Sequence, residues 1–226
     1  EMREDVLWGQ ANAYVALKKL DDAIKRYQTI AEHPTGLRND QALMKLGQIY
    51  YEQQKYTNAA AQYERLAKEF PKSKLAGTAR MNAGYALFQG KDFQQAKQQF
   101  QTAVDTKVQP STALYWKGLS EKALQQYADA IESFEAAAKL TGKVPAAAPI
   151  LFQWGDAALK SGDYEVAKKQ FLASHDVDPK AETADDSLYL AAESALLLAD
   201  LSSTTSLLDQ MEKEYPKSGL AGYQKL

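Results

Sequence analysis

The sequence predicts an all-α fold built from six consecutive helix-turn-helix units, and three observations support this prediction. A small residue recurs at intervals of 36, 37, 34, 37 and 37 residues along the 226-residue chain. In each unit a second position follows twelve residues later, and a large apolar residue follows four residues after that. Short polar or glycine-containing breakers separate the two apolar segments of each unit. Self-similarity at a period of about 20–50 residues is typical of repeat architectures, in which neighbouring units bury a common core.

The recurring small and large residues predict how the two helices of each unit pack. The first small residue, which we call the anchor, is Ala11, Gly47, Gly84, Gly118, Gly155 and Ala192 in the six units. The second position is Ala23, Ala59, Ala96, Ala130 and Ala167, with Thr204 as the exception. Residues four apart share one helix face. The large residues that fill the space behind this contact are therefore Tyr27, Tyr63, Phe100, Phe134, Phe171 and Leu208. Burial of each stabilises the fold by roughly 1.5–3 kcal/mol.

The segments between the helices predict short antiparallel connections. Nine positions after each anchor stands an apolar residue that we expect to hold the turn against the core, namely Leu20, Tyr56, Phe93, Tyr127, Tyr164 and Leu201. The breakers, such as Gln89-Gly90-Lys91-Asp92, are only a few residues long, so neighbouring helices must run antiparallel. Pro71, Pro179 and Pro216 follow second helices and can end them.

These positions predict a single array over residues 1–226, and its last unit differs most from the others. The expected units are residues 4–36, 40–73, 77–110, 111–144, 148–181 and 185–218. Unit six has a run of serine and threonine over residues 202–206, which are poor helix formers, so we expect a looser or shifted second helix there. Residues 216–222 repeat residues 71–77 almost identically, and we expect residues 219–226 to begin a further helix.

The recurring pattern resembles the tetratricopeptide repeat. Unit two carries it best, with Leu43, Leu46-Gly47, Tyr50, Ala59, Tyr63 and Pro71, and the resemblance covers residues 4–218. It implies a right-handed α-α superhelix, or solenoid, whose first helices line a concave groove that binds a partner protein or peptide. The repeat lengths and the Pro-Lys-Ser endings are similar to those of bacterial cell-envelope members of the Tol-Pal coordinator and outer-membrane assembly lipoprotein type. This similarity implies the cell envelope or periplasm as the location, with the cytoplasm as the alternative.

The same resemblance selects candidate groove residues on the first helices. Three residues before each anchor stands a large apolar residue, namely Trp8, Met44, Met81, Tyr115, Phe152 and Tyr189. Further candidates on these helices are Asn12, Gln48, Tyr51, Tyr85, Phe88 and Asp156. Two interpretations of the first set stay open, since these side chains could form a hydrophobic groove or pack against a neighbouring repeat. A clamp for a C-terminal carboxylate is disfavoured, because Trp8 and Lys45 replace its usual lysine and asparagine.

Composition and isolated motifs argue against catalysis and against several kinds of partner. The 27 basic and 29 acidic side chains give a net charge of -2, so nucleic acid is not an expected partner. No stretch of the sequence is apolar enough to span a membrane. Cysteine is absent, and the two histidines, His33 and His175, are expected to be solvated or to cap helix ends. The acidic residues between positions 176 and 186, which are Asp176, Asp178, Glu182, Asp185 and Asp186, lack the spacing of a calcium loop.

The function predicted from these observations is a protein-binding scaffold. We expect no catalytic residue, no metal site and no cofactor, and hence no enzyme. Two alternatives remain open at this point. The chain could be a self-associating structural module that forms a homo-oligomer, or it could be the regulatory segment of a larger multidomain protein.

Overall fold

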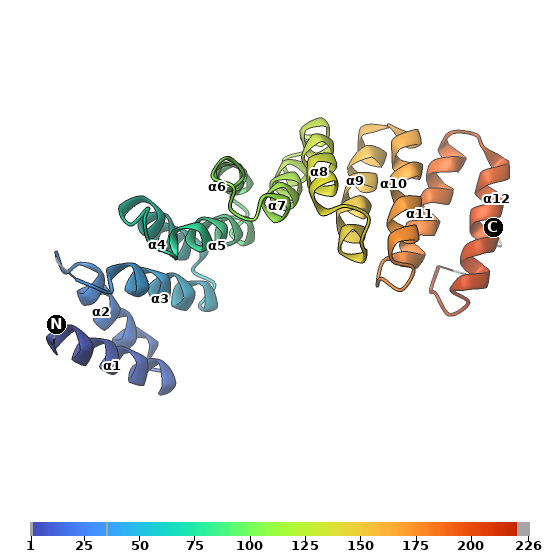
Figure 1. Cartoon of the computed structure of the whole chain (residues 1–226). Coiled ribbons are helices and arrows are strands. Elements are labelled where there is room, and N and C mark those ends of the chain that lie inside the picture. The colour runs from blue at the N-terminus through green and yellow to red at the C-terminus, as the bar shows by residue number, and fades with distance from the viewer. Residues whose placement is uncertain (1, 35, 221–226) are drawn as a thin grey trace. The chain divides into compact units, whose positions relative to one another are not determined.

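The computed structural model describes residues 2–34 and 36–220, and in these residues it confirms the predicted all-α class (Figure 1). They form twelve α-helices, one short 3-10 turn and no β-strand. No helix within these two ranges is long and apolar enough to cross a membrane. The chain divides into two compact units, Glu1–Val108 and Gln109–Leu226, each of which contains three helix pairs.

Each helix pair matches one predicted repeat. Unit 1 contains α1 (Met2–Ala16), α2 (Leu20–Ala31), α3 (Asn39–Glu52), α4 (Tyr56–Glu69), α5 (Ala76–Gln89) and α6 (Phe93–Asp105). Unit 2 contains α7 (Pro110–Ala123), α8 (Tyr127–Thr141), η1 (Pro145–Ala147), α9 (Ala148–Ser161), α10 (Tyr164–Val177), α11 (Ala184–Leu197) and α12 (Leu201–Glu214). The odd-numbered helices are the first helices of the repeats, and each second helix starts at the apolar residue nine positions after its anchor.

The turn inside every repeat has the same backbone geometry. The residue seven positions after the anchor has a positive φ in all six repeats, between 57° and 62° in five of them and 85° at Gly162. The backbone N–H of the following residue donates to the carbonyl five residues earlier. Lys19 donates to Tyr14 and Asp200 donates to Ala195, both at 2.9 Å. This pattern is a Schellman motif, which ends a helix and satisfies its last carbonyls. Five of the six turns thus place a lysine, glutamine or alanine in a conformation that glycine adopts more easily.

The predicted contacts between small and large residues are confirmed in repeats one to five. The alanines at the second small position are all fully buried, and so are the large residues four positions later, apart from a slight exposure of Tyr63. A Cβ atom built on Gly47, Gly84, Gly118 or Gly155 would lie only 2.4 to 2.8 Å from a ring carbon of the large residue. The glycine anchors therefore leave room for an aromatic ring of the second helix.

Repeat six does not have the loose second helix that the serine and threonine run predicts. Helix α12 begins at Leu201, in register with the other second helices. Asp200 accepts the backbone N–H of Ser203 at 3.1 Å. The hydroxyls of Thr204 and Thr205 donate to carbonyls four residues earlier, at 2.8 and 2.9 Å. The prediction was wrong because these side chains satisfy backbone groups of the helix and leave its ladder intact.

The packing of repeat six does differ from that of the other repeats. Leu207 and Met211 are the buried large residues of α12, whereas Leu208 is only half-buried against the same cluster. Leu201, which we expected to hold the turn against the core, is 66% exposed and corrects that prediction for this repeat. The other five residues of that series are half-buried.

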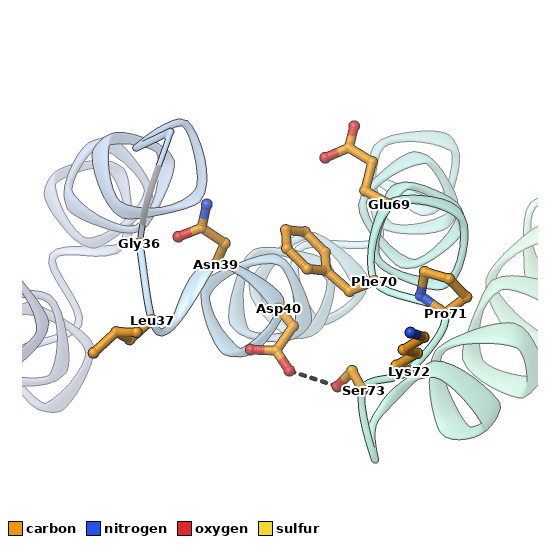
Figure 2. Close-up of a pocket in the computed structure, with 9 residues that line it drawn as sticks. All are labelled: Gly36, Leu37, Asn39, Asp40, Glu69, Phe70, Pro71, Lys72 and Ser73. Atoms are coloured by element: carbon orange, nitrogen blue, oxygen red, sulfur yellow. Dashed lines mark hydrogen bonds between the residues drawn. The ribbon is translucent and has the colours of Figure 1, made fainter.

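The similar segments at residues 71–77 and 216–222 have matching hydrogen bonds as far as residue 220. Ser73 donates to Asp40 at 2.5 Å, as Figure 2 shows, and Ser218 donates to Asp185 at 2.7 Å. Each serine hydroxyl also accepts the backbone N–H two residues later. Both bonds tie the end of a repeat to the start of its own first helix. The predicted further helix over residues 219–226 lies largely outside the described residues.

Candidate functional site

Five of the six large residues placed three before the anchors pack against the large or apolar residues of the repeats. Met44 and Met81 are buried. The rings of Trp8 and Phe152 meet Tyr27 and Phe171 edge to face, with centroids 5.3 and 5.5 Å apart. The rings of Tyr115 and Phe134 are tilted against each other, with centroids 6.0 Å apart. The geometry of these five therefore favours packing over a groove, although the aromatic partners of the three rings lie in their own repeat and not in the neighbouring repeat that was expected.

Tyr189, the sixth member of this set, lies in the same kind of environment. It is half-buried and packs against the cluster that contains Phe171, Leu188 and Met211. Edge-to-face aromatic pairs contribute about 0.5–1.5 kcal/mol beyond the area that they bury. Replacement of such residues would therefore lower stability and would give an ambiguous test of binding.

The other candidates of unit 1 lie one and four positions after their anchors and reach solvent. These residues, which we call the first-helix strip, are Asn12 on α1, Gln48 and Tyr51 on α3, and Tyr85 and Phe88 on α5. Asn12 and Gln48 are exposed, and the three aromatic residues are half-buried. Helices α3 and α5 are neighbours, since the Asn82 amide of α5 reaches the Met44 sulfur of α3 at 3.8 Å.

Each aromatic ring of the first-helix strip is held by a second ring of the same repeat. Tyr51 meets Tyr56 with centroids 5.3 Å apart, and Phe88 meets Phe93 with centroids 5.2 Å apart, both edge to face. Tyr85 leans on the buried Phe100 at 5.5 Å. The strip thus presents fixed apolar edges, which lose little side-chain entropy when another molecule covers them.

The polar groups of the strip have no feature of a catalytic centre. The Tyr27 hydroxyl donates to Asn12 Oδ1 at 2.6 Å, so this amide is already engaged. Burial raises the pKa of Tyr85, and burial together with the charge of Tyr56 raises the pKa of Tyr51. Both phenols are therefore neutral near pH 7 and can donate or accept hydrogen bonds.

In unit 2 three of the six corresponding positions carry charges, namely Lys122, Asp156 and Glu193, and the other three are leucines. Asp156 on α9 accepts from Lys122 of α7 at 2.7 Å and from Lys160 at 2.8 Å. Lys122 also donates to Gln153. Burial raises the pKa of Asp156, but the hydrogen bonds and charges of the two lysines outweigh burial and leave this pKa below its usual range. The ion pair therefore links the first helices of repeats four and five.

The lowered pKa of Asp156 predicts a pH-dependent contribution to stability. Because the pKa of Asp156 is lower in the folded state, its carboxylate stabilises the fold at pH values above the ordinary aspartate pKa of about 4. This stabilisation is lost as the pH falls through the pKa of Asp156 in the folded state. We expect Asp156→Asn to lower the free energy of unfolding near pH 7, and the difference from the wild type to shrink in acid. Urea unfolding at several pH values measures this difference. A matched control is Asp129→Asn, at an exposed aspartate with no ion pair among the described residues. A difference that stays constant from pH 7 to acid would contradict the assigned role.

A pocket of about 550 Å³ in unit 1 lies between two inter-repeat turns, and sequence reasoning did not identify it (Figure 2). One wall is the segment from Gly36 to Asp40 at the start of α3, and the other is the segment from Glu69 to Ser73 after α4. Asn39 donates to the carbonyl of His33 at 2.7 Å, and its Oδ1 atom leaves no room for a Cβ atom at residue 36. The polar groups in this region thus mainly shape the turn.

The two histidines lie in different environments, and only one of them is buried. His33 is exposed, but His175 is only 4% exposed, so the prediction of a solvated or capping histidine is wrong for His175. Its Nε2 atom lies 3.0 Å from the Glu214 carboxylate, and its ring meets Tyr215 edge to face. Glu214 stands 39 residues further along the chain, in the next repeat, so a motif confined to the sequence around His175 does not reveal this contact. Residues 2–34 and 36–220 contain no group of three acidic or histidine side chains placed to hold a metal ion.

The described residues define an all-α protein of helix-turn-helix repeats, and proteins of this class generally act as protein-interaction modules. The sequence matches the family profile of the tetratricopeptide repeat over residues 9–74, 51–107 and 81–148. The chain therefore belongs to the tetratricopeptide repeat family, as its motifs predict. Proteins built from these repeats are typically non-enzymatic scaffolds. A search of curated proteins found no match.

Several solved structures of repeat proteins have the same fold. PilW, a type IV pilus biogenesis factor, is 15% identical, with a TM-score of 0.63 and coverage of 100% of both chains. PilF of Pseudomonas aeruginosa is 18% identical, with a TM-score of 0.60 over 98% of this chain and 96% of its own. YrrB, described as a TPR protein with an unusual peptide-binding site, is 21% identical, with a TM-score of 0.64 over 81% of this chain and 90% of its own. At these identities the similarity shows the fold alone.

Proposed function

We propose that this chain is a scaffold that binds a segment of a partner protein on the first-helix strip of unit 1. The observation that carries the proposal is the arrangement of Tyr51, Tyr85 and Phe88. Their rings reach solvent at equivalent positions of the neighbouring helices α3 and α5, and each is held by a ring of its own repeat. Gln48 adds an exposed amide that can pair with a peptide backbone.

The size and chemistry of the strip set the affinity that we expect. Each aromatic contact contributes about 0.5–1.5 kcal/mol beyond area, and association must first overcome the loss of translational and rotational freedom. Three such rings are enough for a weak to moderate complex with an extended or helical segment. The partner segment should carry apolar side chains at a spacing that matches two consecutive repeats.

The remaining candidates have different roles in this proposal. Trp8, Met44 and Met81 support the strip from below, and Tyr115, Phe152 and Tyr189 support the first helices of unit 2. Asp156 holds the ammonium groups of Lys122 and Lys160 in place on the first helices of unit 2. We place the protein in the bacterial cell envelope, which is supported by the similarity of its fold to those of two pilus proteins, PilW and PilF. The cytoplasm is the alternative location.

The test uses two neighbouring tyrosines of α3. Tyr51 belongs to the strip, whereas Tyr50 is turned toward repeat one, where its hydroxyl accepts a hydrogen bond from Gln28 at 3.4 Å. Both side chains are half-buried, so Tyr50→Ala is a matched control for Tyr51→Ala. With a partner captured on the wild-type chain, we expect Tyr51→Ala to weaken its binding roughly threefold to tenfold, which corresponds to one aromatic contact, and Tyr50→Ala to leave binding unchanged. Calorimetric titration measures both affinities, and circular dichroism checks that both variants are folded.

Equal affinity of the two variants and the wild type would show that the strip is not the binding surface. The alternative is a self-associating module, which is favoured by the exposed apolar residues Leu196, Leu197 and Leu201 around the turn between α11 and α12. Light scattering on the same wild-type sample separates the two functions. Concentration-dependent growth of the particle mass without a partner would favour self-association, and a constant monomer mass would remove it.

A further inference from the structure

A groove of about 490 Å³ lies wholly within unit 2. It runs between the second helices α8 and α10, with η1 and α9 at its base. Its apolar surface includes Ala138 of α8, Leu151 of α9 and Ala173 of α10. None of the residues that the sequence predicts for the concave groove of the first helices lines this second groove.

The connection between repeats four and five opens this groove. Helix α8 ends at Gly142, whose φ of 78° and ψ of −170° suit only glycine. The backbone is extended at Val144 and then forms the turn η1 before α9 starts. Leu151 is half-buried here, whereas Leu43 and Leu188 at the equivalent positions of repeats two and six are fully buried. The groove thus exposes part of a position that repeats two and six bury in the core, while Leu7 and Leu114 at this position of repeats one and four are half-buried like Leu151.

Two polar side chains at the groove have unused hydrogen-bonding capacity. Gln170 lines the groove and is only 5% exposed, and no described residue forms a hydrogen bond with its amide. The indole Nε1 of Trp154, another lining residue, is also buried without an acceptor among the described residues. A buried polar group without a partner is unfavourable. The groove therefore favours an occupant that brings hydrogen-bond acceptors.

The rim of the groove carries excess positive charge. Lys139 is paired with Glu135 at 2.8 Å, and Asp176 lies 3.5 Å from the ring of His175. Lys143 and Lys169 are exposed, and neither has a carboxylate within ion-pair distance in the described part of the chain. Two free ammonium groups beside an apolar surface complement a ligand that is both anionic and apolar.

We propose that this groove binds a peptide segment of a partner protein in which an apolar side chain stands next to a carboxylate. The apolar side chain covers Leu151, Ala138 and Ala173, and the carboxylate lies between Lys143 and Lys169. The carboxylate can come from an acidic side chain or from a C-terminus, since both offer the same acceptor oxygens. This site is separate from the first-helix strip, so failure of either proposal leaves the other intact.

The test is an NMR titration of the intact, ¹⁵N-labelled chain with small peptide probes. The chain has three tryptophans, so the indole N–H signal of Trp154 can be assigned by its loss in Trp154→Phe. The main probe is acetyl-leucyl-aspartyl-amide. Acetyl-leucyl-asparaginyl-amide removes the charge, acetyl-glycyl-aspartyl-amide removes the apolar side chain, and acetyl-glycyl-leucine supplies a C-terminal carboxylate.

We expect the leucyl-aspartyl probe or the C-terminal probe to shift the Trp154 signal while the Trp8 signal in unit 1 stays in place. The tighter of the two probes identifies the source of the carboxylate. Affinity should fall roughly threefold to tenfold in the double variant Lys143→Gln, Lys169→Gln, as expected for two exposed charge contacts. Lys213→Gln, at an exposed lysine of α12, should leave it unchanged.

Three results would overturn the proposal. The first is the absence of any shift of the Trp154 signal up to the solubility limit of both carboxylate probes. The second is equal affinity for the aspartyl and asparaginyl probes, which would exclude recognition of the carboxylate. The third is unchanged affinity in the lysine double variant. The lysines are exposed and outside the core, so their replacement leaves the fold intact and the result interpretable.

Discussion

Phe134→Ala is expected to lower the free energy of unfolding by about 3–5 kcal/mol, the usual cost of truncating a buried aromatic residue. The Phe134 side chain is fully buried, with its ring against Gly118 of the first helix and with Ala130, Ala137 and Ile150 in the same cluster. The cavity left by its removal would be lined in part by the Gly118 backbone and by Ala130 and Ala137, which cannot move in to fill it. Urea unfolding followed by circular dichroism measures the loss.

A matched control for this prediction lies on the same helix. Leu140 of α8 is 58% exposed, so Leu140→Ala removes apolar atoms without opening a cavity and should change stability by less than about 0.5 kcal/mol. Since stability in repeat proteins is nearly a sum of local terms, the transition assigned to unit 2 should be the one that moves. A loss below about 1 kcal/mol for Phe134→Ala would contradict the assigned register of the repeats, because truncation of a buried aromatic residue costs more.

Gly118→Ala is expected to destabilise the chain by up to about 2 kcal/mol, although alanine is the better helix former. A Cβ atom at residue 118 would lie 2.7 Å from a ring carbon of Phe134, which is closer than real side-chain contacts. Alanine gains up to about 1 kcal/mol of helix propensity over glycine, but overpacking in a close-packed core costs about 1–3 kcal/mol. The ring is enclosed by other buried residues and cannot shift freely.

The same contact predicts that a smaller residue at position 134 restores the fit. In the background of Phe134→Leu, Gly118→Ala should therefore cost less than in the wild type, with a coupling energy of about 0.5–3 kcal/mol. A double-mutant cycle by urea unfolding measures this coupling. Additive effects, or stabilisation by Gly118→Ala alone, would contradict the proposed contact.

The repeat architecture could be predicted from the sequence because its cause is periodic in the sequence. A missing Cβ atom at Gly118 and a ring at Phe134 are complementary shapes, and a glycine and a ring at this spacing recur in repeats two to five. The left-handed residue in each turn could not be predicted in the same way. Lysine, glutamine and alanine at that position have no turn signature, and the Schellman hydrogen bonds impose the conformation.

The candidate site could be predicted only in part, because packing and exposure depend on the neighbouring helices. Trp8 and Tyr115 are large aromatic residues of the kind that binding surfaces use, yet their rings pack against the cores of their own repeats. Tyr51 and Phe88 are half-buried to the same degree, and they differ from Trp8 and Tyr115 in their partners, because Tyr56 and Phe93 stand at the starts of second helices and are themselves only half-buried. The groove at Trp154 was missed because the connection between α8 and α9 opens it, and no residue pattern at Trp154 itself indicates this.

The central claim is that a partner covers the first helices of unit 1, and site-specific photo-crosslinking tests it most directly. A benzophenone amino acid replaces Gln48 on the first-helix strip in one sample and Asn58 on the second helix α4 in another, both at exposed positions. If a partner covers these helices, irradiation of the complex joins the partner to position 48 and leaves position 58 unmodified. Crosslinks at position 58 with none at position 48 would contradict the account.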